Sequence, residues 1–206
     1  MPNLLKINKK IDSFKKQIIV DGDKSLSIRW ALMASQANGK SKAYKLLKSE
    51  DVLNTLKCLS KLGVKVNIKN HHCEITGKGP DGFVYKKGLT LNAGNSGTLG
   101  RLILGLLIHS KKRIKLVGDK SLSKRDFSRI TIPLQKFGAK ITSNSNKRLP
   151  ITIISSGKIK PINYFESRGS AQCKSSVMLA ALNTTGKTYI KAKKSRNHSE
   201  LLFKYL

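Results

Sequence analysis

An internal repeat with a period of 72–75 residues constrains the fold of this chain more than any other sequence feature. Three segments open with small polar residues and continue as apolar helical runs; they start at Asp23, Asn95 and Gly169. A second series of helical segments has the same spacing and starts at Ser49, Ser121 and Ser195. Two independent markers that share one period predict three copies of a single structural unit.

The two helical series differ in polarity. In the first, the apolar residues between positions 99 and 108 leave no polar face, which predicts a helix buried on all sides. In the second, Val52, Leu56 and Leu59 follow the stripe of a helix with one face in water. Ser49 is expected to cap that helix. Pro133 predicts a kink in the second member of the series.

Strand-like segments fill the gaps between the helical runs. They are Gln17–Val20, Val64–Ile68, Cys73–Ile75, Leu89–Leu91, Ile114–Val117 and Ile151–Ile154. The resulting order predicts an α/β fold of repeated βαβαββ units, over about residues 21–92, 93–164 and 165–206. The third unit is expected to be incomplete, because residue 206 falls inside its outer helix. We therefore interpret the chain as a piece of a longer protein.

The hexapeptide GDKSLS occurs twice, at Gly22–Ser27 and Gly118–Ser123, but its offset of 96 residues does not match the repeat. The first copy is predicted to open a buried helix and the second an outer one. Both are interpreted as strand-to-helix turns that present backbone N–H groups. The repeated word therefore marks a shared local turn and not the duplication.

The formal net charge is +30, from 41 Lys+Arg against 11 Asp+Glu. Such an excess favours anionic partners. A small anionic ligand is favoured over nucleic acid, because most of the basic residues are Lys, they are spread along the chain, and only 6% of residues are aromatic.

The sequence carries no apolar run long enough to span a bilayer, no secretory signal and no CxxC pair. The adjacent His71 and His72 have no third ligand in the pattern. A cytoplasmic protein without metal or cofactor is expected.

The starts of the buried helices are the candidate functional residues, because a helix N-terminus offers unpaired N–H groups and the positive end of the dipole to an anion. At the first start, Lys24 and Ser25 lie at the turn, and Arg29 follows one turn later on the same face. Three such starts at one end of the molecule would form an anion site. For each start alone, ordinary capping with solvated cations is the alternative.

The second and third starts have the same character. Gly97 in the second permits close backbone approach and is followed by Arg101. The third supplies a hydroxyl and an amide in the run Ser170–Gln172, with Lys174 beyond it.

Five motifs resemble, in order, the signatures of the 5-enolpyruvylshikimate-3-phosphate (EPSP) synthase family. They are DGDKSLSIRWALMASQANGKS, NAGNSGTLGRL, GDKSLSKRD, GSAQCKSSVMLAAL and SRNHSE. The resemblance covers almost the whole chain and implies the inside-out α/β barrel domain of the enolpyruvyl transferases. The family's enzymes are about twice as long, so the chain resembles an N-terminal half. Residues 21–206 would form one domain, and residues 1–20 a strand segment of a second.

The resemblance implies transfer of the enolpyruvyl group of phosphoenolpyruvate to the 5-hydroxyl of shikimate 3-phosphate, in the shikimate pathway to chorismate and aromatic amino acids. Matching positions assign shikimate 3-phosphate to Lys24, Ser25, Arg29, Ser170, Ala171, Gln172, Ser195 and Arg196. They assign phosphoenolpyruvate to Lys24, Gly97, Arg125 and Gln172. The family's acid–base carboxylates lie in the other half. No catalytic residue is therefore assigned here, and the chain alone is expected to be inactive.

Two alternatives stay open. The sister enolpyruvyl transferase that acts on UDP-N-acetylglucosamine pairs its lysine with asparagine and uses a loop cysteine; here Ser25 follows Lys24, and no cysteine lies between Cys73 and Cys173. A non-catalytic anion- or nucleic-acid-binding module is supported by charge alone.

The sequence departs from the family at Asp21 and Asp126, where proline is usual. The full-length protein is expected to be a monomer whose partners are its two substrates, without a membrane or a specific nucleic acid.

Overall fold

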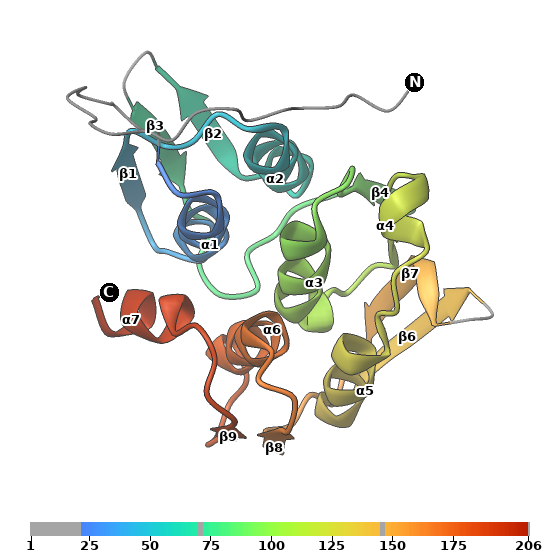
Figure 1. Cartoon of the computed structure of the whole chain (residues 1–206). Helices are drawn as coiled ribbons and strands as arrows, with labels where there is room; N and C mark the ends of the chain where they lie inside the picture. Colours follow the sequence, from blue (N-terminus) through green and yellow to red (C-terminus); the bar gives the residue numbers. More distant parts are fainter. Residues whose placement is uncertain (1–21, 70–71, 145–146, 206) are drawn as a thin grey trace, which may run out of the picture.

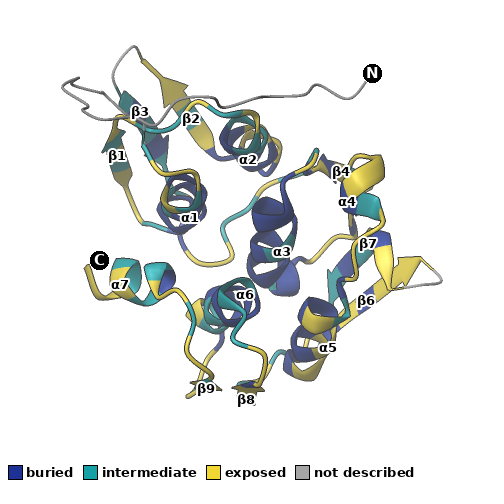
Figure 2. Ribbon diagram, viewed as in Figure 1, coloured by how far each residue is buried: buried dark blue, intermediate teal, exposed yellow. Residues whose placement is uncertain are grey.

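The computed structural model describes residues 22–69, 72–144 and 147–205. Three helices, α1 (Lys24–Ala34), α3 (Gly97–Leu106) and α6 (Ala171–Leu182), lie in the middle of the molecule, with small β-sheets outside them (Figure 1). Figure 2 shows that buried residues gather on these helices. In α3 every residue except Arg101 is buried, which confirms the prediction of a helix enclosed on all sides.

Each sheet uses strands from one stretch of the chain. In the first, β3 (His72–Thr76) lies antiparallel between β1 (Lys40–Tyr44) and β2 (Lys65–Ile68). The second has the order β4-β5-β7-β6, with only the first pair parallel. Its strands are β4 (Leu89–Asn92), β5 (Ile114–Val117), β6 (Ala139–Asn144) and β7 (Arg148–Ser155). In the third, β8 (Asn163–Glu166) pairs in parallel with β9 (Tyr189–Ala192).

Most of the expected strands are confirmed within a residue or a few at their ends. The predicted strand Gln17–Val20 lies outside the described residues. The strands β1, β6, β8 and β9 have no counterpart among the predicted strand segments.

The outer helices are α2 (Glu50–Lys61), α4 (Lys120–Ser123), α5 (Ser128–Phe137) and α7 (His198–Tyr205), and a 3-10 turn, Leu107–His109, follows α3. α5 continues through Pro133, where a kink is predicted, and the break in this helical segment lies earlier, between α4 and α5. There the Asp126 carboxylate accepts the Ser128 N–H at 2.6 Å and its hydroxyl at 2.8 Å, which starts a new helix. Pro133 removes only one helical hydrogen bond so close to that start.

Several helices begin with a hydrogen bond from a capping side chain. The two GDKSLS copies behave alike: Asp23 Oδ1 accepts the Leu26 N–H, and Asp119 Oδ1 accepts the Leu122 N–H, each at 2.7 Å. Both copies therefore open helices, as predicted, because the aspartate satisfies a first-turn donor. Ser49 stands at the N-cap position of α2 but makes no capping hydrogen bond through its side chain, so that detail of the prediction is wrong.

Serines cap the other two central helices. Ser96 accepts the Leu99 N–H and Ser170 accepts the Cys173 N–H, each at 3.3 Å. Gly105 lets α3 approach α6, because a Cβ there would collide with the Ser176 carbonyl.

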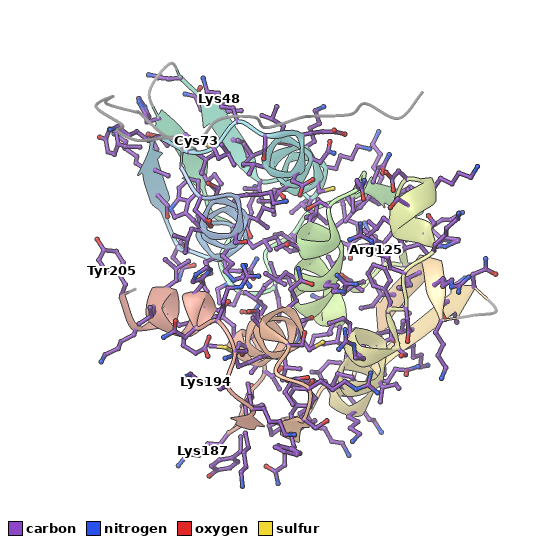
Figure 3. The ribbon with its side chains drawn as sticks, in the orientation of Figure 1. Lys48, Cys73, Arg125, Lys187, Lys194 and Tyr205 are labelled. Atoms are coloured by element: carbon purple, nitrogen blue, oxygen red, sulfur yellow. The ribbon has the colours of Figure 1, made fainter. Side chains whose placement is uncertain are left out.

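In Figure 3, the side chains of Lys187 and Lys194 lie at the opposite end of the molecule from Lys48. None of the described helices combines the length and apolar character needed to cross a membrane. Among the described residues, no group of three or more His, Cys, Asp or Glu is arranged to hold a metal ion.

Candidate functional site: an anion hollow at the helix starts

The first turns of α1, α3 and α6 border one hollow of about 460 Å³. We call it the polar hollow. It is lined by Lys24, Ser25, Arg29, Thr98, Gly169, Ser170, Ala171, Gln172, Arg196 and His198. The first residue of α7 thus joins the three buried helices at this point. The starts of the three buried helices therefore meet at one hollow.

The polar hollow is electrostatically positive. Lys24, Arg29 and Arg196 line it, and none of the described lining residues is acidic. Three helix N-termini add their positive dipole ends. One opposing charge next to the hollow is that of Asp51, whose Oδ2 lies 3.1 Å from the half-exposed Lys24 Nζ. An anion entering the hollow would compete with Asp51 for this lysine.

Arg29 is the most firmly held cation of the polar hollow. It is only 4% exposed, and it donates from Nε to Ser199 Oγ at 2.9 Å, from Nη2 to Ser175 Oγ at 3.3 Å and from Nη1 to the Ser25 carbonyl at 3.2 Å. Burial lowers the pKa of Arg29, and the charge of Arg196 lowers it further, while Asp23 and Glu200 oppose the change. An arginine stays protonated despite such a shift, so the hollow keeps a fixed, oriented positive charge.

Gln172 connects the hollow to a second group of cations. Its Nε2 donates to Thr98 Oγ1 at 2.9 Å, and its Oε1 accepts from Arg101 Nη1 at 2.8 Å. Both ends of the amide are therefore held by α3. This leaves Gln172 fixed between the hollow and Arg101.

Arg101 and Arg125 flank Gly97, and we call them the guanidinium pair. A Cβ at Gly97 would lie 2.9 Å from Nη1 of each. Arg125 also donates from Nη2 to Asn95 Oδ1 at 3.1 Å and lies beside α3 in Figure 3. Burial lowers the pKa of Arg101. Glycine therefore lets both guanidinium groups approach the backbone, and a side chain here would press on them.

The turn before α6 is held by a buried carboxylate. Glu166, 4% exposed at the end of β8, accepts the Ser170 N–H at 2.6 Å and the Arg168 N–H at 3.3 Å. Gly169 between them has a φ of +69°, which suits glycine. Glu166 thus fixes the position of Ser170 and the residues that follow it.

Most of the residues that the sequence singled out come together. The polar hollow contains seven of them: Lys24, Ser25, Arg29, Ser170, Ala171, Gln172 and Arg196. Gly97 and Arg125 lie instead at the guanidinium pair. Ser195 does not line the hollow, and its hydroxyl is buried without a partner among the described residues.

Lys174 follows the third start in the sequence, but its side chain does not line the hollow and pairs with Glu200. His198 begins α7 and also lines the hollow. Thr98 was missed as a lining residue, although it lies next to Gly97 in its motif.

Comparison with known proteins identifies close relatives. The model of the family described as EPSP synthase (3-phosphoshikimate 1-carboxyvinyltransferase) matches residues 8–206. The chain is 41% identical over 187 residues to 3-phosphoshikimate 1-carboxyvinyltransferase of Streptococcus mutans, covering 90% of this chain and 44% of the relative. The enzyme of the same name from Streptococcus uberis is 42% identical over 192 residues, covering 92% of this chain and 45% of the relative.

Solved structures agree with the sequence relatives. Two structures of EPSP synthase from Acinetobacter baumannii superpose with TM-scores of 0.85 and 0.86 at 35% identity. Each alignment covers 93% of this chain and 43% or 44% of the solved chain. The chain thus spans less than half the length of the relatives that it matches. On the match to the family model and these likenesses, the chain belongs to the EPSP synthase family.

Proposed function

We propose that this chain supplies the substrate-binding half of an active site that transfers the enolpyruvyl group of phosphoenolpyruvate to the 5-hydroxyl of shikimate 3-phosphate. The polar hollow is the observation that carries the proposal. It gathers three cations and three helix N-termini without an acidic residue among its described lining. Such a site suits a phosphate ester, because both the charges and the N–H groups favour a dianion.

The two substrates are assigned to two neighbouring places. Shikimate 3-phosphate is assigned to the polar hollow, through Lys24, Arg29 and Arg196 together with the turn Ser170–Gln172. Phosphoenolpyruvate is assigned to the guanidinium pair at Gly97, with Lys24 and Gln172 between the two. Holding two anions side by side in one orientation supplies the proximity that a bimolecular transfer needs.

The acid–base step is assigned to residues outside this chain. Enolpyruvyl transfer requires a group that removes the 5-hydroxyl proton and one that protonates the methylene carbon. The described lining of the hollow offers cations, hydroxyls and an amide but no carboxylate. We therefore propose that the chain binds substrates but does not turn them over alone, and that the partner carboxylates come from the other half of a full-length enzyme.

Further parts of the proposal concern organisation. We propose that the chain is built of three repeated units within an inside-out barrel domain, supported by the three separate sheets around central helices. Residues 1–20 are assigned to the second domain. The full-length enzyme is proposed to be cytoplasmic and monomeric.

Isothermal titration of shikimate 3-phosphate into the chain tests the proposal. Lys24→Ala and Arg29→Lys are expected to weaken binding at least tenfold, because each removes or misplaces a charge in the hollow. Lys136→Ala is the matched control, since this exposed lysine lies on α5 away from the hollow. Equal affinity in all four proteins contradicts the proposal. Salt-sensitive oligonucleotide binding that survives both site variants would favour the basic nucleic-acid-binding module instead.

A further inference from the structure

The side chain of Arg29 is held from outside its own helix. Its Nε donates to Ser199 Oγ in the first turn of α7, and its Nη2 donates to Ser175 Oγ in α6. Ser175 and Ser199 are 1% and 2% exposed, and their hydroxyl oxygens lie 2.6 Å apart. Three helices therefore meet at one guanidinium group.

The direction of these hydrogen bonds follows from the proton count. Ser175 Oγ lies 2.6 Å from the Ala171 carbonyl, to which it donates its only proton. The Ser199 hydroxyl must then donate to Ser175 Oγ. Both oxygens are left with lone pairs for Arg29, so the pair of serines forms an acceptor built for a guanidinium.

The remaining donors of Arg29 are available to a ligand. A guanidinium has five N–H donors, and the described residues take three of them, through Ser199, Ser175 and the Ser25 carbonyl. Two donors remain, the number that a bidentate pair with a phosphate or carboxylate requires. Arg29 lines the polar hollow, where such an anion is expected.

A second contact fixes the first turn of α7 next to Ser199. Lys174 of α6, only 8% exposed, pairs with Glu200. The ion pair and the serine pair lie on neighbouring residues of both helices, so α7 is docked on α6 at two adjacent points.

We propose that Ser199, together with Ser175, is a positioning residue for Arg29: the docked first turn of α7 holds the guanidinium so that its two remaining N–H groups face the anion. The positioning itself does not depend on which anion binds; only the assignment of that anion to shikimate 3-phosphate rests on the proposed function. Without the serine pair Arg29 keeps its charge but loses its fixed orientation.

The test compares four variants of the chain. Ser199→Ala removes the acceptor, and Ser199→Thr keeps a hydroxyl. Ser176→Ala is the matched control, since Ser176 is also a fully buried α6 serine but donates to the Arg101 carbonyl and not to Arg29. Arg29→Lys identifies the Arg29 Nε–H resonance in ¹⁵N–¹H spectra by its disappearance.

The first readout is the exchange of the Arg29 Nε–H with water, measured by NMR without any ligand. Ser199→Ala is expected to speed this exchange at least about tenfold, since a hydrogen bond to a charged group is lost, while Ser199→Thr and Ser176→Ala leave it slow. Exchange in Ser199→Ala that equals that in Ser176→Ala overturns the inference.

The second readout is titration with inorganic phosphate. The dissociation constant is expected to rise roughly five- to tenfold in Ser199→Ala and to stay within twofold of the parent in Ser199→Thr and Ser176→Ala. If Ser199→Ala binds phosphate with the same affinity as the parent chain, although its Arg29 Nε–H exchanges faster, the orienting role is also overturned. If the parent chain binds no phosphate at all but the exchange changes as expected, the positioning is supported and the proposed function fails instead.

Discussion

The buried carboxylate of Glu166 gives the sharpest test of how the site is held. Its two oxygens accept the N–H groups of Ser170 and Arg168 at 2.6 and 3.3 Å, and the residue is 4% exposed. Glu166→Gln keeps the shape but removes the charge and replaces one acceptor with an NH₂ group. The NH₂ group of the glutamine then faces a backbone N–H of the turn, so two buried donors meet without an acceptor, and an unmade hydrogen bond in a buried site is costly.

The expected loss follows from those contacts. Hydrogen bonds to a charged group contribute about 1.5–3 kcal/mol each. The amide retains one acceptor, so the expected decrease in the free energy of unfolding is about 2–3 kcal/mol. For a chain of this size that corresponds to a fall of roughly 5–10 °C in the melting temperature.

Urea unfolding followed by circular dichroism measures the change. Glu74→Gln is the control, because its ion pairs with Lys40 and Lys42, at 3.5 and 3.8 Å, involve largely exposed lysines and are expected to contribute no more than about 1 kcal/mol. A loss in Glu166→Gln no larger than that in Glu74→Gln would refute the assignment of Glu166 as the holder of the turn. The same variant is expected to weaken phosphate binding, because Ser170 loses its fixed position.

Three further outcomes are expected. Gly97→Ala should displace the guanidinium pair, which lies 2.9 Å from the new Cβ, and weaken phosphoenolpyruvate binding in titrations, whereas Gly39→Ala, with open space around it, should not; equal affinities contradict this. Glu200→Gln leaves its buried lysine partner unpaired and should lower the free energy of unfolding by about 1–2 kcal/mol, less than for a fully buried pair because Glu200 is 37% exposed; a neutral effect in urea unfolding contradicts it. Burial lowers the pKa of His109, so its contribution to stability is present above about pH 6.5 and is lost as the pH falls; His109→Gln should flatten the acid side of the stability profile, and an unchanged slope between pH 7 and 5 refutes it.

Central helices were predictable from the sequence because their pattern is local. Apolar residues all round α3 permit only a buried helix, and the aspartate of each GDKSLS turn caps its own first turn. The edge strands were not predictable. β1, with the sequence KSKAY, alternates exposed and half-buried residues without an apolar face, and β8 and β9 are four residues each. Short strands of this kind are defined by their partners and not by their own pattern.

The site was predictable only as far as its residues lie at helix starts. Lys24 and Ser170 could be found because each stands at the start of a predicted buried helix, where capping residues and cations are recognisable in the sequence. Proximity to a helix start is not sufficient by itself: Lys174 follows the third start in the sequence, but its side chain pairs with Glu200 on another helix. Ser199 gives no local signal, since its contact with Arg29 exists only after distant segments have packed together. Glu166 lies only two and four residues before the N–H groups that it holds, but nothing in the helical pattern singles it out.

Because a partner of Arg29 lies far along the chain, the parts of the site can form only in a fixed order during synthesis. Its acceptor Ser199 lies 170 residues further along the chain. At a synthesis rate of ~5–20 residues per second, Ser199 is added to the chain roughly 10–30 s after Arg29. A nascent chain that stops before α7 has its central helices, but its Arg29 lacks the Ser199 acceptor. Affinity for an anion should therefore rise once α7 has been synthesised and has docked on α6.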